Sequence, residues 1–427
     1  KSPPGPWGWP FIGHLKYFTG KYYITLFNLN SKYGYVYQLR LGNQNFIIVS
    51  SVESILEALI QSGHAYCGRQ DLPAYNMLYK GDRQRGVHTA DFNEMYRIKR
   101  SFIDASLDGY CSNVETIEDK ITSEVLEAMD GFLETSESLD PFLILETSCL
   151  NITMKLVFGE RLDPQKKVTN DLLAIFHERS AIKMLNPSDY IPLLKAFKTN
   201  DHLEFIGDIT SKQLQNQSKI INLHKDTYDP SHLRDMVDHL LLFLECGQDL
   251  EMLTKDDIEY LLLDLVNYGY EAMSVLVMWL IGYMAANPGI QDKVQNEIDS
   301  VVGRDRLPSL RDHPFLPYTT AVILETQRIV TVFPFLIPHV LTENRTLKGY
   351  NLPSGSTVLF NIWSLHHDTK YWKNPMKFDP QRFLNEDNSL EIPDYYMPYG
   401  AGPRQCAGES LAEIELFLFF STMMQQL

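Results

Sequence analysis

The stretch Pro398-Tyr399-Gly400-Ala401-Gly402-Pro403-Arg404-Gln405-Cys406-Ala407-Gly408 decides how the whole chain is interpreted. Its glycines allow a tight turn and a close approach of the backbone to a flat ligand. A helix is expected directly after Cys406, and the NH groups at its start would stabilise a thiolate. Arg404 can pair with an anionic group. A buried structural cysteine needs none of these features, so the pattern predicts a cysteine that binds a ligand.

The rest of the composition narrows the class of protein. The chain has 427 residues, of which 44% are hydrophobic, so a large core is expected. The net charge of −16 gives no basic excess for a nucleic-acid partner. No stretch is expected to reach the roughly 18 apolar residues of a membrane span. No pair of cysteines has the spacing of a zinc ribbon or redox dithiol; they are Cys67, Cys111, Cys149, Cys246 and Cys406.

The hydrophobic pattern predicts a mainly helical chain with smaller β regions near the N-terminus and after residue 335. A hairpin is predicted over residues 35–51, with Gly42 and Asn43 at its turn. Thr254 and Asp257 predict a capping box, followed by a long interior helix as far as residue 287. The other predicted elements are helices over 91–105, 113–160, 170–225, 288–303, 315–330 and 409–427, and strands over 346–350 and 357–361.

The cysteine stretch fits the pattern F-G-x-G-x-R-x-C-x-G, with Tyr399 in the place of Phe. On this motif the chain resembles the cytochrome P450 superfamily along its whole length. The resemblance implies the cytochrome P450 fold, with haem b between the long central helix and the cysteine loop. It also implies that Cys406 supplies the axial thiolate to the iron. We expect a single catalytic domain over residues 1–427, with residues 1–10 as a Pro-rich hinge.

Two further motifs match the family, and together they predict a structural triad. Glu325-Thr326-Gln327-Arg328 matches the E-x-x-R of the family, and both charges fall on one helical face. Phe378-Asp379-Pro380-Gln381-Arg382-Phe383 matches its P-x-R-F segment. The resemblance implies a buried triad of Glu325, Arg328 and Arg382. An E-x-x-R taken alone would be an ordinary surface ion pair.

The resemblance also assigns contacts with the haem. Tyr96 and Arg100 match the W-x-x-x-R of the family, with Tyr96 in the place of Trp, and both would contact a haem propionate. His339 is expected to be a second propionate partner; the alternative is a strand histidine that faces solvent. Arg404 and Tyr399 complete the expected cofactor contacts.

The segments IPHVL, NIWSLHHD and MPYGAGPRQCAGE resemble the animal microsomal branch, near the steroid 17α-hydroxylases and their xenobiotic-oxidising relatives. This resemblance implies a monomer at the cytoplasmic face of the endoplasmic reticulum membrane. It implies a membrane anchor before Lys1 and a β region after Leu427. It also implies electron supply by NADPH–cytochrome P450 reductase, docking near Arg97 and Lys99. The alternative for these two cations is a solvated helix face.

The central helix departs from the family at the oxygen site. The family has A-G-x-[DE]-T-[TS], whereas this chain has Tyr268-Gly269-Tyr270-Glu271-Ala272-Met273. Ala272 stands where the threonine of the family helps to deliver protons, and Tyr268 stands where the family has a small residue. Residues four apart share a helix face, so both should lie toward the haem. The candidate catalytic positions are therefore Tyr268, Glu271 and Ala272.

Three interpretations of this departure stay open on sequence alone. The first is a monooxygenase that inserts one oxygen atom of O₂ into a sterol, fatty acid or xenobiotic, with protons from Tyr268, Glu271 or an ordered water. The second is a haem-thiolate isomerase or dehydratase that acts on lipid peroxides. The third is a non-catalytic haem protein that binds a lipid or gas.

The substrate pocket is expected to be apolar and narrow. The resemblance assigns substrate contacts to five positions, and for each of them the alternative is ordinary core packing. They are Met77, Leu78, Val332, Phe333 and Ile337.

Overall fold

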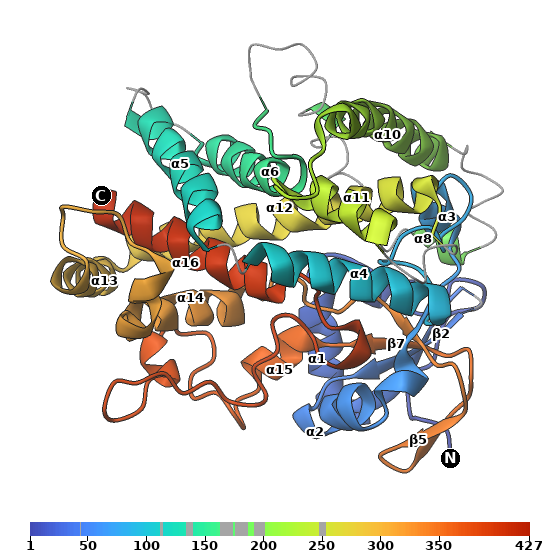
Figure 1. The fold of residues 1–427 in the computed structure, drawn as a ribbon. Coiled ribbons are helices and arrows are strands. Elements are labelled where there is room, and N and C mark those ends of the chain that lie inside the picture. The colour runs from blue at the N-terminus through green and yellow to red at the C-terminus, as the bar shows by residue number, and fades with distance from the viewer. Residues whose placement is uncertain are drawn as a thin grey trace.

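The computed structural model describes residues 1–42, 44–111, 114–133, 140–162, 174–175, 187–191, 201–246 and 253–427. Helices make up most of this part of the chain, and the strands gather at one side of the molecule (Figure 1). The α-helices are α1 (Tyr22–Tyr33), α2 (Val52–Leu56), α3 (Pro73–Leu78), α4 (Glu94–Cys111), α5 (Val114–Leu133), α6 (Phe142–Phe158), α8 (Pro187–Tyr190), α10 (Asp201–Thr227), α11 (Met236–Cys246), α12 (Lys255–Ala286), α13 (Pro288–Val301), α14 (Pro317–Val330), α15 (Ile362–His367) and α16 (Glu409–Gln426). The strands are β1 (Val36–Leu41), β2 (Gln44–Val49), β3 (Gly68–Arg69), β4 (His339–Val340), β5 (Arg345–Leu347), β6 (Tyr350–Leu352) and β7 (Thr357–Phe360).

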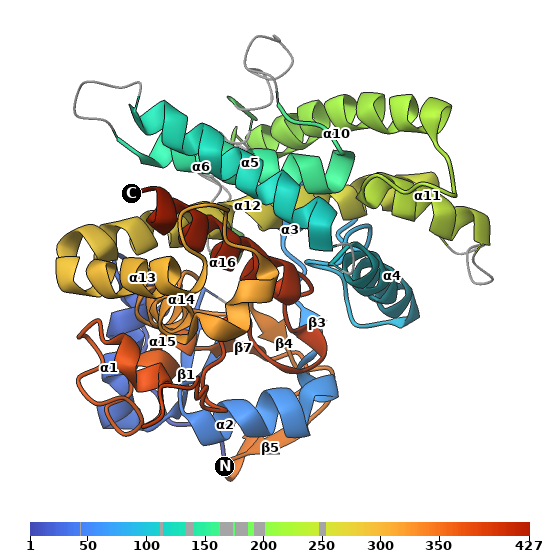
Figure 2. The same cartoon turned by 60° about the vertical axis from the view of Figure 1, so that its left-hand side comes forward.

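The long helix α12 is the centre of the fold, and its predicted start is confirmed. Thr254 Oγ1 accepts a hydrogen bond from the backbone NH of Asp257 at 3.2 Å, and the Asp257 carboxylate accepts one from the NH of Thr254 at 2.9 Å. This capping box satisfies NH groups that would otherwise have no partner at the helix start. The helix then runs for 32 residues and packs against α6, α10, α14 and α16 (Figures 1 and 2).

We expected no stretch with the length and composition of a membrane span. This expectation was wrong. Within α12 the residues Asp257–Ala286 are long and apolar enough to cross a bilayer. Helices pack on several sides of this segment, and Leu261, Leu262 and Val266 belong to the largest core cluster. About 39% of the apolar window of this segment is buried inside the protein, and Trp279 is exposed, so the helix is only partly enclosed by the core.

Strands from both predicted β regions form one five-stranded sheet. Its strand order is β1-β2-β7-β4-β3, so the N-terminal hairpin pairs with a strand from the last quarter of the chain. β1 and β2 are antiparallel, as the hairpin prediction requires, whereas β2 and β7 are parallel. The predicted strand over 346–350 was wrong in its extent. It is a separate hairpin of β5 and β6, because the chain turns with positive φ at Lys348 and Gly349.

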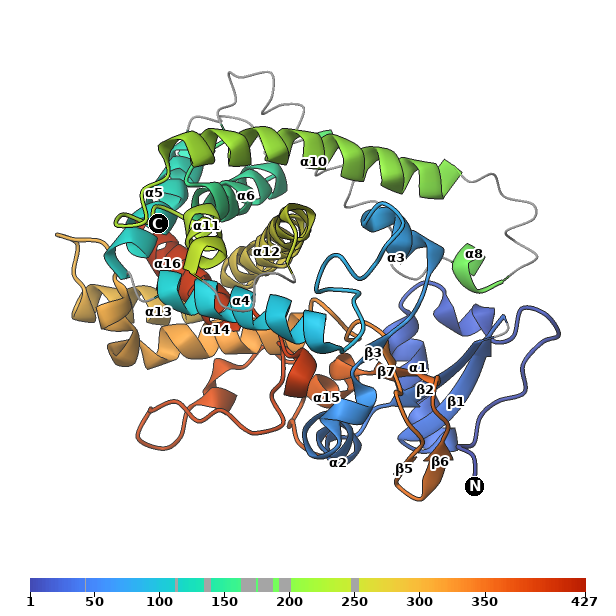
Figure 3. The same cartoon turned by 45° about the vertical axis from the view of Figure 1, so that its right-hand side comes forward.

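The remaining helix predictions hold with shifted ends. The amphipathic segment after residue 91 forms α4, which is longer than expected. Residues 113–160 contain α5 and α6, and residue 113 and residues 134–139 lie outside the described part. Within 170–225 the described residues place the C-terminal half in α10 (Figure 3), and most of the residues before 201 lie outside that part. The predicted apolar C-terminal helix is α16.

Helix α16 carries a carboxyl group into the core. The side chain of Glu415 is 3% exposed, and its Oε1 has no hydrogen-bond partner among the described residues. Burial raises the pKa of Glu415 from 4.5 to about 8, because the charged form loses its hydration. The group is therefore protonated in the folded protein at neutral pH.

This burial predicts a pH dependence of stability. In the unfolded chain Glu415 loses its proton near pH 4.5, whereas in the folded chain it keeps the proton up to about pH 8. The free energy of unfolding should therefore fall as pH rises between these values, by at most ~1.4 kcal/mol per pH unit from this group. Glu415→Gln, which keeps the shape without the titration, should reduce that slope. Thermal unfolding of both proteins from pH 5 to 8 checks this, and equal slopes would contradict it.

Candidate functional site

The turn before Cys406 depends on its glycines. Gly400 and Gly402 have φ values of 74° and 75°, a region that other residues rarely adopt. A Cβ at Gly402 would collide with the carbonyl oxygen of Leu59, so the turn packs directly on a neighbouring backbone. The NH of Cys406 donates to the carbonyl of Tyr399 at 3.0 Å, which closes the turn. Helix α16 begins at Glu409, just beyond the cysteine.

The thiol of Cys406 is reachable by solvent although protein surrounds it on most sides. A side chain that lines a concave surface combines these two properties. Burial raises the pKa of Cys406, while the backbone NH of Gly408 and the charge of Arg100 act to lower it. Coordination to a metal ion removes the proton from a thiol outright. A bound metal ion would therefore outweigh the effect of burial, which disfavours the thiolate of Cys406.

Three of the expected cofactor contacts hold the cysteine turn itself. The hydroxyl of Tyr399 accepts a hydrogen bond from Gln327 Nε2 at 2.7 Å, which ties the turn to α14. The hydroxyl of Tyr96 donates to the carbonyl of Pro403 at 3.4 Å. Arg100 Nη1 donates to the carbonyl of Gln405 at 2.7 Å, and its Nε pairs with Asp104, one turn further along α4. The turn is thus fastened to α4 and α14.

Two guanidinium groups, of the buried Arg69 and the half-buried Arg404, lie together beside this turn. Arg404 donates to the carbonyls of Cys67 and Ala90, and its guanidinium lies 3.9 Å from the ring centroid of Tyr96. Arg69, which is 6% exposed, donates through Nε to the carbonyl of His88, while its Nη1 has no partner within the described part of the chain. Among the described residues neither arginine forms an ion pair with a carboxylate.

These arginines fit an anionic cofactor. Burial, and next the charge of Arg404, lower the pKa of Arg69 to about 9, and burial lowers the pKa of Arg404. A guanidinium does not give up its proton in proteins, so a buried and a half-buried cation that lack a carboxylate partner in the described part of the chain call for an anion. The carboxylates of a haem propionate would supply it. Sequence reasoning missed Arg69, because it matches no motif and its neighbours come from distant parts of the chain.

His339 lies next to Arg69, because β3 and β4 pair these two residues directly. The alternative of a solvent-facing histidine was wrong: the side chain is buried, and its Nδ1 lies 2.6 Å from the carbonyl of Tyr66. Burial, and next the charge of Arg69, hold the pKa of His339 well below its usual value. With Nδ1 donating to Tyr66, Nε2 of the neutral ring is an acceptor. Nε2 can donate to a carboxylate only when the ring of His339 is protonated, and a nearby carboxylate favours the protonated ring.

The three candidate catalytic positions lie on one face of α12. Tyr268 and Ala272 are partly exposed, and the side chain of Glu271 is exposed. The ring of Tyr268 stacks on the imidazole of His88, with centroids 3.7 Å apart and planes inclined by 5°. Sequence reasoning missed His88, which lies in the segment between α3 and α4.

The expected substrate residues are distributed over two parts of the structure. Val332, Phe333 and Ile337 follow α14, where Phe333 is 52% exposed and Val332 packs against the largest core cluster. Met77 and Leu78 lie in α3, and both belong to a second cluster that includes residues of α10.

The expected role of Lys99 in partner docking was wrong. Its side chain is buried, and its Nζ donates to the carbonyls of Gln84 and Arg85 and pairs with Asp257 at 2.6 Å. The alternative of a solvated helix face was wrong for Lys99 as well, because the segment before α4 covers it. Arg97 is exposed, and its guanidinium lies 4.9 Å from the ring centroid of Phe92.

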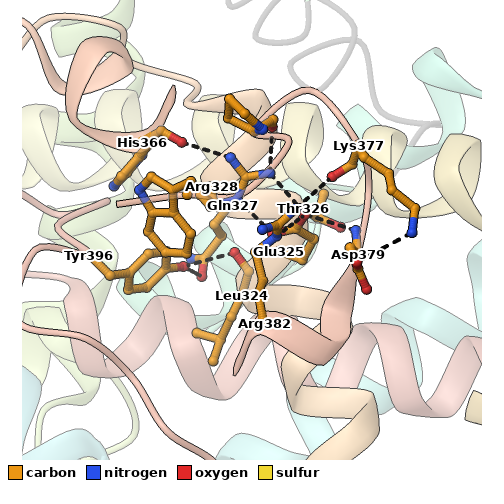
Figure 4. Close-up of polar contacts among 12 residues, drawn as sticks. Leu324, Glu325, Thr326, Gln327, Arg328, His366, Lys377, Asp379, Arg382 and Tyr396 are labelled. Atoms are coloured by element: carbon orange, nitrogen blue, oxygen red, sulfur yellow. Dashed lines mark hydrogen bonds and ion pairs between the residues drawn. The ribbon is translucent and has the colours of Figure 1, made fainter. Parts of the chain in front are cut away.

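The motif residues Glu325, Arg328 and Arg382 meet in the core (Figure 4). Arg328 donates to both oxygens of Glu325, at 2.6 and 2.8 Å, and both side chains are fully buried. Arg382 Nε adds a bond to Glu325 at 3.1 Å. The remaining donors of Arg328 reach the carbonyls of His366 and Pro375. This pair thus joins α14 to the chain after α15.

We predict that Glu325→Ala gives misfolded or haem-free protein. Removing one partner of a buried ion pair costs about 3–5 kcal/mol, since the other charge is left unpaired. Arg345→Ala, which breaks an exposed ion pair with Glu343, is the matched control and should leave stability nearly unchanged. Soluble yield and haem content measure the effect. A soluble, haem-loaded Glu325→Ala protein that differs from wild type only in its kinetics would contradict the structural role.

Comparison with known proteins identifies the family. Residues 3–427 match the family model described as Cytochrome P450. The whole chain aligns with cytochrome P450 1A1 of Rattus norvegicus at 31% identity, covering 84% of that protein, and with that of Homo sapiens at 30% identity, covering 86%. A solved zebra fish cytochrome P450, described with progesterone, superposes with a TM-score of 0.85 at 28% identity, over 96% of this chain and 92% of the other.

The chain therefore belongs to the cytochrome P450 family, and its fold is that of the family. It is a haem-thiolate monooxygenase, an oxidoreductase whose cofactor is haem b with a cysteine thiolate as axial ligand. Members of the family pair with a redox partner and bind hydrophobic substrates. Among the three interpretations of the sequence, the family assignment supports the monooxygenase.

Proposed function

We propose that Cys406 provides the axial thiolate and that Arg69, Arg404 and His339 hold the haem propionates. The observation that carries this proposal is the pair of guanidinium groups beside the cysteine turn, one buried on Arg69 and one half-buried on Arg404, which have no carboxylate partner among the described residues. Tyr96 and Arg100 assist by holding the turn, and the ring of Tyr96 also lies against the guanidinium of Arg404.

When bound, the haem supplies oxygen activation, because a thiolate ligand pushes electron density to the iron and favours O–O cleavage. The chain itself must then position the substrate, exclude water and deliver protons. In this protein Ala272 offers no hydroxyl for proton delivery. Tyr268 and Glu271 lie on the same face of α12, within one turn of Ala272. Proton supply therefore falls to the phenol of Tyr268, the carboxylate of Glu271 or a water between them.

The substrate proposed here is a small apolar molecule: a sterol, a fatty acid or a xenobiotic. Support comes from the partly buried apolar side chains at the expected substrate positions, such as Val332 and Ile337. The similar zebra fish cytochrome P450 is described with a steroid, progesterone, which fits this class.

The electron donor proposed here is NADPH–cytochrome P450 reductase. Such a partner would approach the side of the cysteine turn, where α4 presents Arg97 to solvent. Lys99 takes no part in this contact, since it is committed to Asp257 inside the protein.

The enzyme is further proposed to be a monomer that associates with the endoplasmic reticulum membrane at its cytoplasmic face. Exposed aromatic side chains near the start of the chain support this association, since aromatic rings are enriched at membrane–water interfaces. Trp7 is 86% exposed and Phe11 is 81% exposed.

The proposed ligand predicts a spectroscopic result. The reduced, CO-bound wild type should show the red-shifted Soret band that is characteristic of thiolate-ligated haem. Cys406→His should lose that band while it still binds haem, because an imidazole replaces the thiolate. Cys149→Ala, at a buried cysteine far along the chain from the turn, is the control that should keep it. Retention of the band in Cys406→His would exclude Cys406 as the ligand.

The altered oxygen site predicts that NADPH consumption is poorly coupled to product formation. Proton delivery by a positioned group contributes about 10²–10⁴-fold, so without the threonine hydroxyl much of the NADPH consumed with reductase should end as hydrogen peroxide or water. Ala272→Thr, alone and with Tyr268→Ala to make room, should raise the ratio of product to NADPH consumed. Product, NADPH and peroxide are measured together.

The same assays distinguish the monooxygenase reaction from peroxide rearrangement and from non-catalytic binding. Fast turnover of a lipid hydroperoxide without reductase, NADPH or oxygen, together with no NADPH-dependent product, would contradict the proposed reaction. A protein that shifts its Soret band with apolar ligands but turns over neither substrate would contradict it as well.

A further inference from the structure

The segment Gln84–His88, between α3 and α4, is fastened along one face of α12. The face consists of Asp257, Tyr260, Asp264 and Tyr268, whose spacing of three and four residues places them in line on a helix. Each of these four side chains contacts the segment or the residue that binds it. Figure 3 shows the chain between α3 and α4 passing beside α12.

Successive residues of this face of α12 contact successive residues of the segment, directly or through Lys99. Lys99 Nζ binds Asp257 at 2.6 Å and the carbonyls of Gln84 and Arg85 at 2.9 and 2.7 Å. Arg85 Nη1 then donates to the hydroxyl of Tyr260 at 3.0 Å, and its guanidinium lies over the same ring. Both the segment and the helix are thus held by charged hydrogen bonds, which are about twice as strong as neutral ones.

The next turn of the helix holds the end of the segment. One oxygen of Asp264 accepts from the NH groups of Val87 and His88, at 2.8 and 3.2 Å, and the other accepts from the hydroxyl of Tyr79 at 2.6 Å. Residue 86 must be glycine here, since a Cβ would collide with Tyr79 and Asp264. The backbone of His88 is therefore held in place beside α12.

The last contact is the stack of His88 on Tyr268. With ring centroids 3.7 Å apart and planes 5° from parallel, the two rings are in van der Waals contact, and no other group fits between them. The stack lies beside the proposed propionate site. The carbonyl of His88 accepts from Arg69 at 3.3 Å, and the carbonyl of Val87 accepts from Arg404 at 3.4 Å.

We propose that the stacked rings of His88 and Tyr268 are a fixed wall of the haem site that limits the width of the molecules that can reach the iron. Asp264 is the positioning residue of this wall. A single small ring such as imidazole then binds normally, whereas a ligand that carries a second ring beside its iron-binding group is excluded. This inference rests on the proposed binding of haem at Cys406. It assigns the size limit to two side chains from distant parts of the sequence.

The test uses nitrogen ligands of two widths with the haem-loaded ferric protein, and the readout is the Soret shift, not turnover. Wild type should bind imidazole much more tightly than phenylimidazole. Tyr268→Ala should raise the affinity for phenylimidazole relative to imidazole by ~10-fold or more, because the phenyl ring gains an apolar site. Tyr268→Phe is the matched control: it keeps the ring, so it should leave the ratio within about twofold of wild type.

Two more variants keep the test decisive. His88→Ala leaves α12 intact and should shift the ratio in the same direction, even if Tyr268→Ala fails to hold haem. Asp264→Asn should give a smaller shift in that direction, whereas a purely structural role of Asp264 would lower stability without changing the ratio. An unchanged ratio in His88→Ala, in protein with the thiolate Soret band, would overturn the proposed wall. A wild type without that band would instead overturn the proposed function, and this inference with it.

Discussion

The turn that carries Cys406 is held from three sides, and the remaining features of the site depend on this constraint. Gln327 of α14 binds Tyr399, Arg100 of α4 binds the carbonyl of Gln405, and the glycines let the turn rest on the backbone at Leu59. A cysteine in a mobile loop would not present one sulfur atom in one direction. Here backbone hydrogen bonds fix that direction, and the start of α16 adds NH groups that favour a thiolate.

The protein is acidic overall, but positive charge gathers near the cysteine turn. The chain has a net charge of −16, yet the buried Arg69 and the half-buried Arg404 lie near the cysteine turn without a carboxylate partner among the described residues. Elsewhere in the described core a buried cation is neutralised, as Arg328 is by Glu325 and Lys99 is by Asp257. This contrast distinguishes a ligand site from a structural ion pair. The structural pairs close the fold, and the two unneutralised cations need an anion from outside the chain.

Much of this arrangement could be predicted from local sequence. The capping box of Thr254 and the glycines of the cysteine turn depend on neighbours a few residues away, so a short stretch of sequence reveals them. The errors arose from contacts between distant segments. The environment of Lys99 is set by the segment that covers α4, and the role of Arg69 becomes visible only when β3 pairs with β4. Similarly, no periodicity shows that His88 stacks on Tyr268, 180 residues further along the chain.

The central claim is that the sulfur of Cys406 binds the haem iron, and X-ray absorption at the iron edge tests it most directly. The ferric wild-type protein should show one sulfur neighbour of the iron in addition to the porphyrin nitrogens. In Cys406→His protein reconstituted with haem, that sulfur contribution should disappear and a lighter atom should replace it. A wild-type spectrum without sulfur, or a sulfur contribution that persists in the variant, would contradict the account.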